Sequence, residues 1–200
     1  MSPMLDFYFD FYSPYGYLAA HRIDAIAGRY GREVKWHAIL LGPAFKAVGA
    51  RPLVDIPLIG AYSRHDFART ARLEGMPFVM PPTFPGATLA AARAFHWLDE
   101  QDPVLAKTFA RAVYQAAFGE GRDILDVQQL AQVAAGCGVD AGAMQEAIRT
   151  DAVKARLKAE VDASLARGVF GSPFVIVDGE AFWGNDRLVQ VEEWLRRGGW

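Results

Sequence analysis

The chain has 200 residues, of which 52% are hydrophobic, and its formal net charge is −2. This length predicts one domain, or one domain with a large insert, and the composition suffices for a substantial core. A nearly balanced charge without a basic block excludes bulk electrostatic attraction to nucleic acid or to an acidic membrane. The single cysteine, Cys137, excludes an internal disulfide. We recognise neither a leader peptide nor a membrane span and therefore expect a cytoplasmic protein.

An aromatic run over residues 7–12 predicts a buried strand that leads directly into a helix. Ser13 is a typical N-cap and Pro14 fits a first helical turn, so we expect one helix over residues 14–30. A second strand is expected over residues 34–40, which would complete a parallel βαβ unit. Ser13 therefore lies where a sheet ends and a helix begins, a position suited to binding an anion. Simple helix capping is the alternative interpretation.

Glycine and proline interrupt residues 42–57, which predicts an irregular loop at the sheet edge where open α/β folds bind ligands. Its cations are Lys46 and Arg51. Residues 58–74 predict a helix whose basic face points to solvent or to an anionic ligand. Residues 76–86 must be extended, because four prolines fall within nine residues, and their apolar side chains are candidates for a pocket wall.

The next part of the chain predicts helix after helix, each bounded by proline, aspartate or glycine. These helices are expected over residues 87–100, 103–118, 127–135, 140–148 and 151–166. A β-hairpin then follows, with strands at 174–177 and 180–183 around an Asp178-Gly179 turn. A last helix over 187–197 would be capped by Asn185 or Asp186.

The order βαβ, helical block, ββα predicts an α/β protein of thioredoxin-like fold with a large all-helical insert. Residues 1–41 and 168–200 would form the thioredoxin-like domain, and residues 42–167 the linker loop and helical insert domain. A C-x-x-C motif at the start of the first helix is the redox signature of that fold. Here the four residues are Ser-Pro-Tyr-Gly, and serine cannot form a mixed disulfide, which argues against an oxidoreductase.

Three separated motifs, at residues 10–18, 168–173 and 182–188, carry a closer resemblance. With them the whole chain resembles the 2-hydroxychromene-2-carboxylate isomerases, DsbA-like proteins related to kappa-class glutathione transferases. The resemblance implies glutathione-dependent cis–trans isomerisation of 2-hydroxychromene-2-carboxylate to trans-o-hydroxybenzylidenepyruvate, a step of naphthalene-type aromatic degradation, through reversible addition of the glutathione thiolate. It also implies a homodimer.

The same resemblance assigns roles to individual residues. Ser13 would be catalytic, donating a hydrogen bond that lowers the pKa of the glutathione thiol. The glutathione-binding residues would be Ser13, Ser172, Pro173, Trp183, Gly184, Asn185 and Asp186. The aromatic carboxylate substrate would be bound by Lys46, Ile56, Pro57 and Phe84.

No metal site is expected. Two alternatives stay open: a kappa-class-like glutathione transferase acting on another electrophile, and a non-catalytic thioredoxin-fold binding protein.

Overall fold

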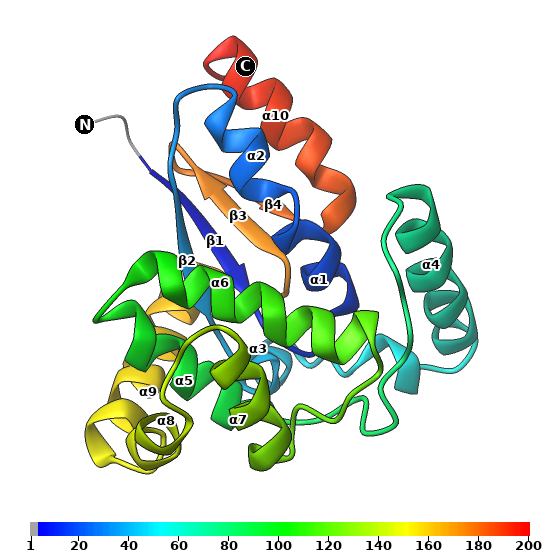
Figure 1. Cartoon of the computed structure of the whole chain (residues 1–200). Helices are drawn as coiled ribbons and strands as arrows, with labels where there is room; N and C mark the ends of the chain where they lie inside the picture. The colour runs from blue at the N-terminus through cyan, green and yellow to red at the C-terminus, as the bar shows by residue number, and fades with distance from the viewer. Residues whose placement is uncertain (1–3) are drawn as a thin grey trace.

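The computed structural model describes residues 4–200, which are built around a four-stranded mixed sheet in the order β2-β1-β3-β4 (Figure 1). The strands are β1 (Leu5–Phe9), β2 (Val34–Ala38), β3 (Phe174–Val177) and β4 (Glu180–Trp183). β1 and β2 are parallel, with Phe7 opposite Trp36, whereas β3 runs antiparallel to β1 and β4 antiparallel to β3. This arrangement confirms the predicted βαβ and ββα halves and the α/β class.

The first strand ends earlier than the aromatic run predicted, at Phe9 instead of Tyr12. The chain turns at Asp10, whose backbone carbonyl accepts a hydrogen bond from the N–H of Ser13 at 2.9 Å. The side chain of Asp10 also accepts one from the N–H of Tyr12 at 2.9 Å. Local hydrogen bonding by an aspartate thus outcompetes strand pairing at the three residues before the helix.

The helix expected over residues 14–30 is in fact two helices, α1 (Pro14–Ala20) and α2 (Ile23–Gly28). They are separated at His21, whose ring nitrogen Nδ1 contacts the carbonyl oxygen of Tyr17 at 2.9 Å. α2 restarts without a side-chain cap. The apolar periodicity continues across the break, which is why it did not reveal the interruption.

The expectation of an irregular loop over residues 42–57 is wrong in its first half. Helix α3 (Leu41–Val48) begins directly after β2, followed by a 3-10 turn, η1 (Leu53–Asp55). Pro43 falls in the first turn of α3, where proline is tolerated, and Gly49 ends the helix with a positive φ of 68°. The glycine and proline that suggested a loop therefore mark the two ends of a short helix.

The predicted helical block is confirmed, and it lies beside the sheet in Figure 1. Its members are α5 (Leu89–Asp99), α6 (Pro103–Tyr114), the π-helical turn η2 (Gln115–Gly119), α7 (Val127–Gly136), α8 (Ala141–Ala147) and α9 (Asp151–Ala166). The separate helix predicted over residues 58–74 is α4 (Ile59–Leu73). The side chains of Asp102, Asp126, Asp140 and Thr150 each accept a hydrogen bond from a backbone N–H at a helix start. Residues 76–86 contain no helix, as their prolines predict.

The two faces of the sheet pack differently because neighbouring side chains of β1 point to opposite sides. Phe7 and Phe9 enter the large core, which contains residues of α1, α2, α5 and α6. Tyr8 points the other way, into a small cluster with Ile39, Val169, Phe174 and Ile176. Phe9 lies 5.2 Å from Phe95 of α5 and 5.9 Å from Tyr114 of α6, measured between ring centroids. These contacts attach the helical insert to the sheet directly beneath the start of α1.

The last helix, α10 (Leu188–Arg197), follows a 3-10 turn, η3 (Asn185–Arg187), and packs on α2 and β4. The two prolines at Phe84-Pro85 and Ser172-Pro173 follow cis peptide bonds. Within residues 4–200, every helix is too short or too polar to cross a bilayer.

Candidate functional site

Ser13 is the buried N-cap of α1, and its hydroxyl is hydrogen-bonded on both sides. Its Oγ accepts from the N–H of Gly16 at 3.0 Å and donates to the backbone carbonyl of Ser172 at 2.8 Å. The second bond spans 159 residues of sequence and joins the Ser-Pro-Tyr-Gly motif to the residue before Pro173. The capping interpretation and the site interpretation of Ser13 are thus both supported by the same hydroxyl.

Asp10 and Tyr114 form the floor of this arrangement. The N–H of Asp10 donates to Ser172 Oγ at 3.0 Å, and the Tyr114 hydroxyl donates to the carbonyl of Asp10 at 2.7 Å. Both side chains are buried. Burial raises the pKa of Asp10, although hydrogen bonds from Tyr12, Leu41 and Thr88 oppose that rise.

Burial also raises the pKa of Tyr114 well above its ordinary value of 10.0, so its hydroxyl stays protonated and donates. The floor is therefore a rigid, uncharged donor–acceptor chain apart from the Asp10 carboxyl.

Gly16 leaves the space in which these groups meet. A Cβ at this position would lie 2.5 Å from the Tyr114 hydroxyl and 3.0 Å from both Ser13 Cβ and Ser172 Oγ. Any larger residue would push apart the groups that hold Ser13 in place.

The cis-proline loop is also tied to the loop after β4. The N–H of Gly184 donates to the carbonyl of Pro173 at 3.0 Å, and Gly184 has a φ of 113°, which favours glycine. The N–H of Ser172 donates to no protein atom within residues 4–200. An extended peptide lying along this loop would find an available donor there.

Asn185 does not cap α10, contrary to expectation, because η3 separates it from that helix. It is buried, and its Nδ2 donates to Glu74 Oε1 at 2.8 Å, an oxygen that also accepts from Arg22 at 2.7 Å. Two acceptors beside this bond, Asn185 Oδ1 and Glu74 Oε2, are buried and receive no hydrogen bond from any of residues 4–200. Unsatisfied buried acceptors are rare in folded proteins and indicate a missing donor, such as water or an ammonium group.

Asp186 does not cap α10 either. It is exposed, and its carboxylate pairs with the neighbouring Arg187 at 2.8 Å. Trp183 is 54% exposed and lies edge to face against Phe170, with ring centroids 4.9 Å apart. Ser172 bonds directly to Ser13, Gly184 bonds to Pro173, and the turn η3, which carries Asn185 and Asp186, packs on α1. Trp183 and Phe170 form an aromatic pair at the surface.

The predicted substrate residues are more dispersed. Lys46 is an exposed residue of α3 and makes no hydrogen bond or ion pair within the described part of the chain. Phe84 packs 5.7 Å from the ring of Tyr12 and 6.0 Å from that of Phe118. Phe84 therefore lies next to the Ser13 turn.

Ile56 and Pro57 instead form the turn between η1 and α4. The N–H of Gly60 donates to the carbonyl of Ile56, and that of Ile59 to the carbonyl of Pro57, each at 2.8 Å. Pro57 is exposed and Ile56 partly buried. Among residues 4–200, neither a ring contact nor a hydrogen bond links this turn to Phe84, so the predicted slot between them stays a prediction.

Helix α4 is attached to the Ser13 turn through Tyr15. The Tyr15 hydroxyl donates to Asp66, and its ring lies 4.8 Å from that of Phe67, both on α4. Asp66 in turn pairs with Arg69 at 2.6 Å. The basic face expected on this helix is exposed, as predicted.

Cys137 lies in the turn between α7 and α8, and burial raises the pKa of its thiol. Among residues 4–200, no three His, Cys, Asp or Glu side chains are grouped so that they would hold a metal ion.

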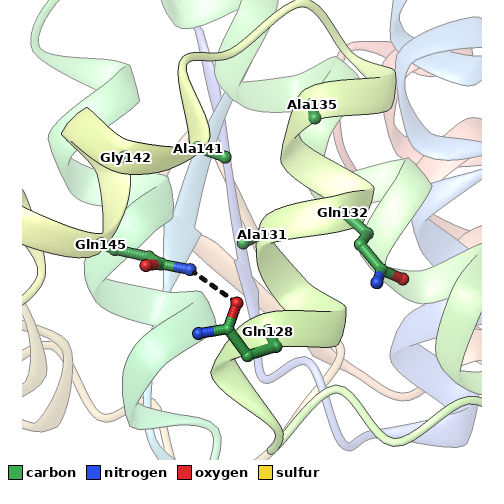
Figure 2. A pocket seen from close by; sticks show the side chains of 7 residues that line it. All are labelled: Gln128, Ala131, Gln132, Ala135, Ala141, Gly142 and Gln145. Atoms are coloured by element: carbon green, nitrogen blue, oxygen red, sulfur yellow. Dashed lines mark hydrogen bonds between the residues drawn. The ribbon is translucent and has the colours of Figure 1, made fainter.

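A hollow of about 280 Å³ lies between α7 and α8, lined by alanine, glycine and the three glutamines Gln128, Gln132 and Gln145 (Figure 2). Gln145 donates to Gln128 at 3.3 Å across it. It is formed entirely by the helical insert, whereas Ser13 lies at the start of α1.

Sequence reasoning missed two residues of the site, Glu74 and Tyr114. Glu74 follows the last turn of a helix and gives no local signal. Tyr114 reads as an ordinary apolar position of an amphipathic helix. A third residue, Asp10, was visible as the one carboxylate in an aromatic run, but its partners were not.

Comparison with known proteins gives a consistent result. The family model of the DSBA-like thioredoxin domain matches residues 4–196. A 2-hydroxychromene-2-carboxylate isomerase of Pseudomonas putida is 31% identical over 197 residues, covering 97% of this chain and 95% of that protein.

A solved structure of a 2-hydroxychromene-2-carboxylate isomerase superposes with a TM-score of 0.89 at 30% identity, covering 98% of this chain and 95% of that one. Glutathione S-transferase kappa 1 of Caenorhabditis elegans is a more distant relative, 25% identical over 98% of this chain and 92% of that protein.

Proposed function

The chain belongs to the DSBA-like thioredoxin domain family and, within it, to the 2-hydroxychromene-2-carboxylate isomerases, and on this premise we propose that it is a glutathione-dependent isomerase of 2-hydroxychromene-2-carboxylate. The product would be trans-o-hydroxybenzylidenepyruvate. The observation that carries the proposal is the placement of the Ser13 hydroxyl against the carbonyl of Ser172. A serine in this position retains the hydrogen bond that a thiolate needs and removes the disulfide chemistry of the fold.

Bound glutathione would supply a thiolate that adds reversibly to the conjugated substrate, so that a carbon–carbon bond can rotate. The task of Ser13 is to stabilise negative charge on the sulfur, since a free thiol has a pKa near 8.5 and is largely protonated at neutral pH. For this the hydroxyl proton turns from the Ser172 carbonyl towards the sulfur, while Gly16 N–H continues to hold Oγ in place. The charge is then stabilised by a fixed donor at low entropic cost.

Three features of the chain fit glutathione. Ser172 offers an N–H that finds no acceptor in the described part of the chain and is suited to the peptide part of the molecule. The buried acceptors of Glu74 and Asn185 suit an ammonium group such as that of the γ-glutamyl unit. Trp183, Gly184 and Asp186 would line the approach to them.

We assign the substrate carboxylate to Lys46, because its ammonium group has no competing partner within residues 4–200. Phe84 would contact the aromatic ring from the side of Tyr12. Ile56 and Pro57 would close the slot only after the turn that carries them approaches Phe84.

We further propose that the protein is a homodimer, that it acts in naphthalene-type aromatic degradation and that it is cytoplasmic. A homodimer would elute from size exclusion at about twice the 22.0 kDa mass of the chain.

The decisive experiment follows the absorbance of 2-hydroxychromene-2-carboxylate with purified protein, with and without glutathione, while free thiol is titrated. Conversion that requires glutathione at constant free thiol supports the isomerase. Loss of one thiol per substrate consumed would instead identify a transferase, the reaction for which the kappa-class relative is named. No conversion, together with no calorimetric binding of glutathione, would leave a binding protein.

A further inference from the structure

Asp10 joins more parts of the site than any residue discussed above. It lies at the end of the central strand β1, it is 5% exposed, and its carboxylate contacts no lysine or arginine within residues 4–200. Burying a carboxylate without a cation is unfavourable unless its oxygens are fully hydrogen-bonded. The donors to this carboxylate therefore show which segments of the chain it connects.

The two oxygens of Asp10 take different partners. Oδ1 accepts from the N–H of Tyr12 and from the hydroxyl of Thr88, both at 2.9 Å. Oδ2 accepts from the N–H of Leu41 at 2.8 Å. Leu41 is the first residue of α3, and the N-cap Leu40 supplies no side-chain acceptor. Asp10 thus completes the N-terminus of α3 from a different element, 31 residues away in sequence.

The backbone of the same residue holds the other half of the site. Its carbonyl accepts from Ser13 N–H at 2.9 Å, and its N–H donates to Ser172 Oγ at 3.0 Å. One residue therefore connects Ser13 and Ser172 on one side with the helix that carries Lys46 on the other.

We propose that Asp10 is a positioning residue that fixes α3, and with it Lys46, relative to the Ser13 hydroxyl. The inference rests on the proposed function, because it explains how the distance between the Ser13 hydroxyl and the substrate-binding Lys46 is kept fixed. Misplacement of a substrate-binding group by about 1 Å can reduce turnover by up to about 10²-fold. A hydrogen bond at the base of α3 is a direct means of preventing it.

The test uses Asp10→Asn, because an amide keeps one acceptor and replaces the other with a donor. When the amide oxygen takes the place of Oδ1, the hydrogen bonds from the Tyr12 N–H and the Thr88 hydroxyl are kept. The NH₂ group then takes the place of Oδ2 and faces the N–H of Leu41, so that hydrogen bond is lost. We expect the KM for 2-hydroxychromene-2-carboxylate to rise by about tenfold or more, since a displaced Lys46 would lose its charged hydrogen bond to the substrate carboxylate, which is worth more than about a factor of ten. The dissociation constant for glutathione should change less than about twofold, because Asp10→Asn keeps the backbone bonds to Ser13 and Ser172 and independent sites perturb one another by no more than about that factor.

A second variant, Leu41→Pro, removes the same hydrogen bond from the other end and decides the matter if Asp10→Asn does not fold. Proline is accepted at a first helical position, and Leu40 already has the extended backbone (φ −118°, ψ 123°) that a following proline requires. Thr88→Val is the matched control. It removes an Asp10 contact of 2.9 Å, against 2.8 Å for Leu41, that leads to α5 instead of α3, so it should lower stability without changing the KM.

A double-mutant comparison with Lys46→Ala completes the test. If Asp10 acts through Lys46, adding Asp10→Asn to Lys46→Ala raises the KM no further. The inference would be overturned if the KM increases of Asp10→Asn and Lys46→Ala multiplied in the double variant. It would also be overturned if the KM were unchanged in both Asp10→Asn and Leu41→Pro. In either case the proposed isomerase function would stand. A wild-type protein without glutathione-dependent turnover would overturn both.

Discussion

The hydroxyl of Ser13 donates to the carbonyl oxygen of Ser172 at 2.8 Å, so the candidate catalytic donor is already oriented by the backbone before Pro173. A donor held in this way exchanges one acceptor for another when a thiolate arrives, and little side-chain entropy is lost.

Replacing Ser13 with alanine should leave the fold and most of the glutathione affinity intact but reduce turnover. A hydrogen bond to a charged group is worth about 1.5–3 kcal/mol, which corresponds to a thiol pKa about 1 to 2 units higher in the variant. The thiolate is the reactive form, so the acidic limb of the pH–rate profile should move to higher pH. Spectrophotometric titration of the bound thiol measures the same pKa independently of turnover.

Ser164→Ala is the matched control for that experiment. Ser164 is also a buried serine whose hydroxyl donates to a backbone carbonyl, that of Val161, at 2.8 Å, but it lies on α9. Its pH–rate profile should match the wild type. An identical profile for Ser13→Ala would remove Ser13 from the mechanism.

Lys46→Ala should mainly weaken binding of the carboxylate substrate. Loss of a charged hydrogen bond predicts a KM increase of roughly tenfold or more with a smaller change in kcat. Lys35→Ala serves as the control, since Lys35 is an exposed lysine of β2. Steady-state kinetics with varied substrate at saturating glutathione measures both constants, and equal KM values for the two variants would contradict the placement of Lys46.

Gly16→Ala should destabilise the protein and lower its activity, whereas Gly28→Ala should not. A methyl group at Gly16 would collide with Tyr114, Ser13 and Ser172, while one at Gly28 has no neighbour within 4 Å. Overpacking of this kind costs about 1–3 kcal/mol. Urea unfolding of the two variants gives the difference, and similar free energies of unfolding would show that the Gly16 space is not tightly packed.

Stability should depend on pH through His37, which bridges two carboxylates on the far side of the sheet. Its ring nitrogens lie 2.7 Å from Glu160 and 2.9 Å from Asp6. Burial opposes protonation of the ring, but the hydrogen bonds to both carboxylates outweigh it and raise the pKa of His37 above its ordinary value of 6.5. The stabilising contribution is therefore complete below about pH 6.5 and is lost as the pH rises through the folded-state pKa.

The two carboxylates contribute a pH dependence of stability with the opposite sign. Burial disfavours their charged forms, yet the hydrogen bonds with His37 leave the pKa values of Asp6 and Glu160 below 3.8 and 4.5. Their contribution is present above these ordinary values and is lost as the pH falls through the lower folded-state values. The network should be strongest between about pH 4.5 and 6.5.

The free energy of urea unfolding, measured from about pH 3 to 9 so that both the carboxylates and the histidine titrate, tests this window. The decline above neutral pH should be absent in His37→Gln and retained in His65→Gln, a substitution on the exposed face of α4. Parallel curves for wild type and His37→Gln would exclude the network as the source.

What the sequence predicted well was encoded locally. The hairpin of β3 and β4 was predicted from Asp178-Gly179, and both residues have the positive φ values, 53° and 90°, that the tight turn needs. The helix starts at Asp102, Asp126 and Asp140 were equally visible, because each cap bonds to a backbone group two or three residues away.

What it could not predict depends on partners distant in sequence. The amide of Asn185 bonds to Glu74, 111 residues away, so local reasoning assigned it to the nearest helix start instead. Asp10 reads as one charge in an aromatic strand, yet its hydroxyl partner Thr88 lies 78 residues away. Helix α3 was missed because its boundaries are set partly by Asp10, an acceptor outside its own segment.

The placement of Cys137 has a consequence for how the protein responds to its surroundings. Its thiol lies in the turn between α7 and α8, and the position equivalent to a redox cysteine is occupied by Ser13. The polypeptide therefore holds no cysteine thiol of its own at this edge of the sheet that oxidants could inactivate. Under the proposed function, oxidative stress would act through the supply of a diffusible reduced thiol, and activity would recover as soon as that supply did, without repair of the protein.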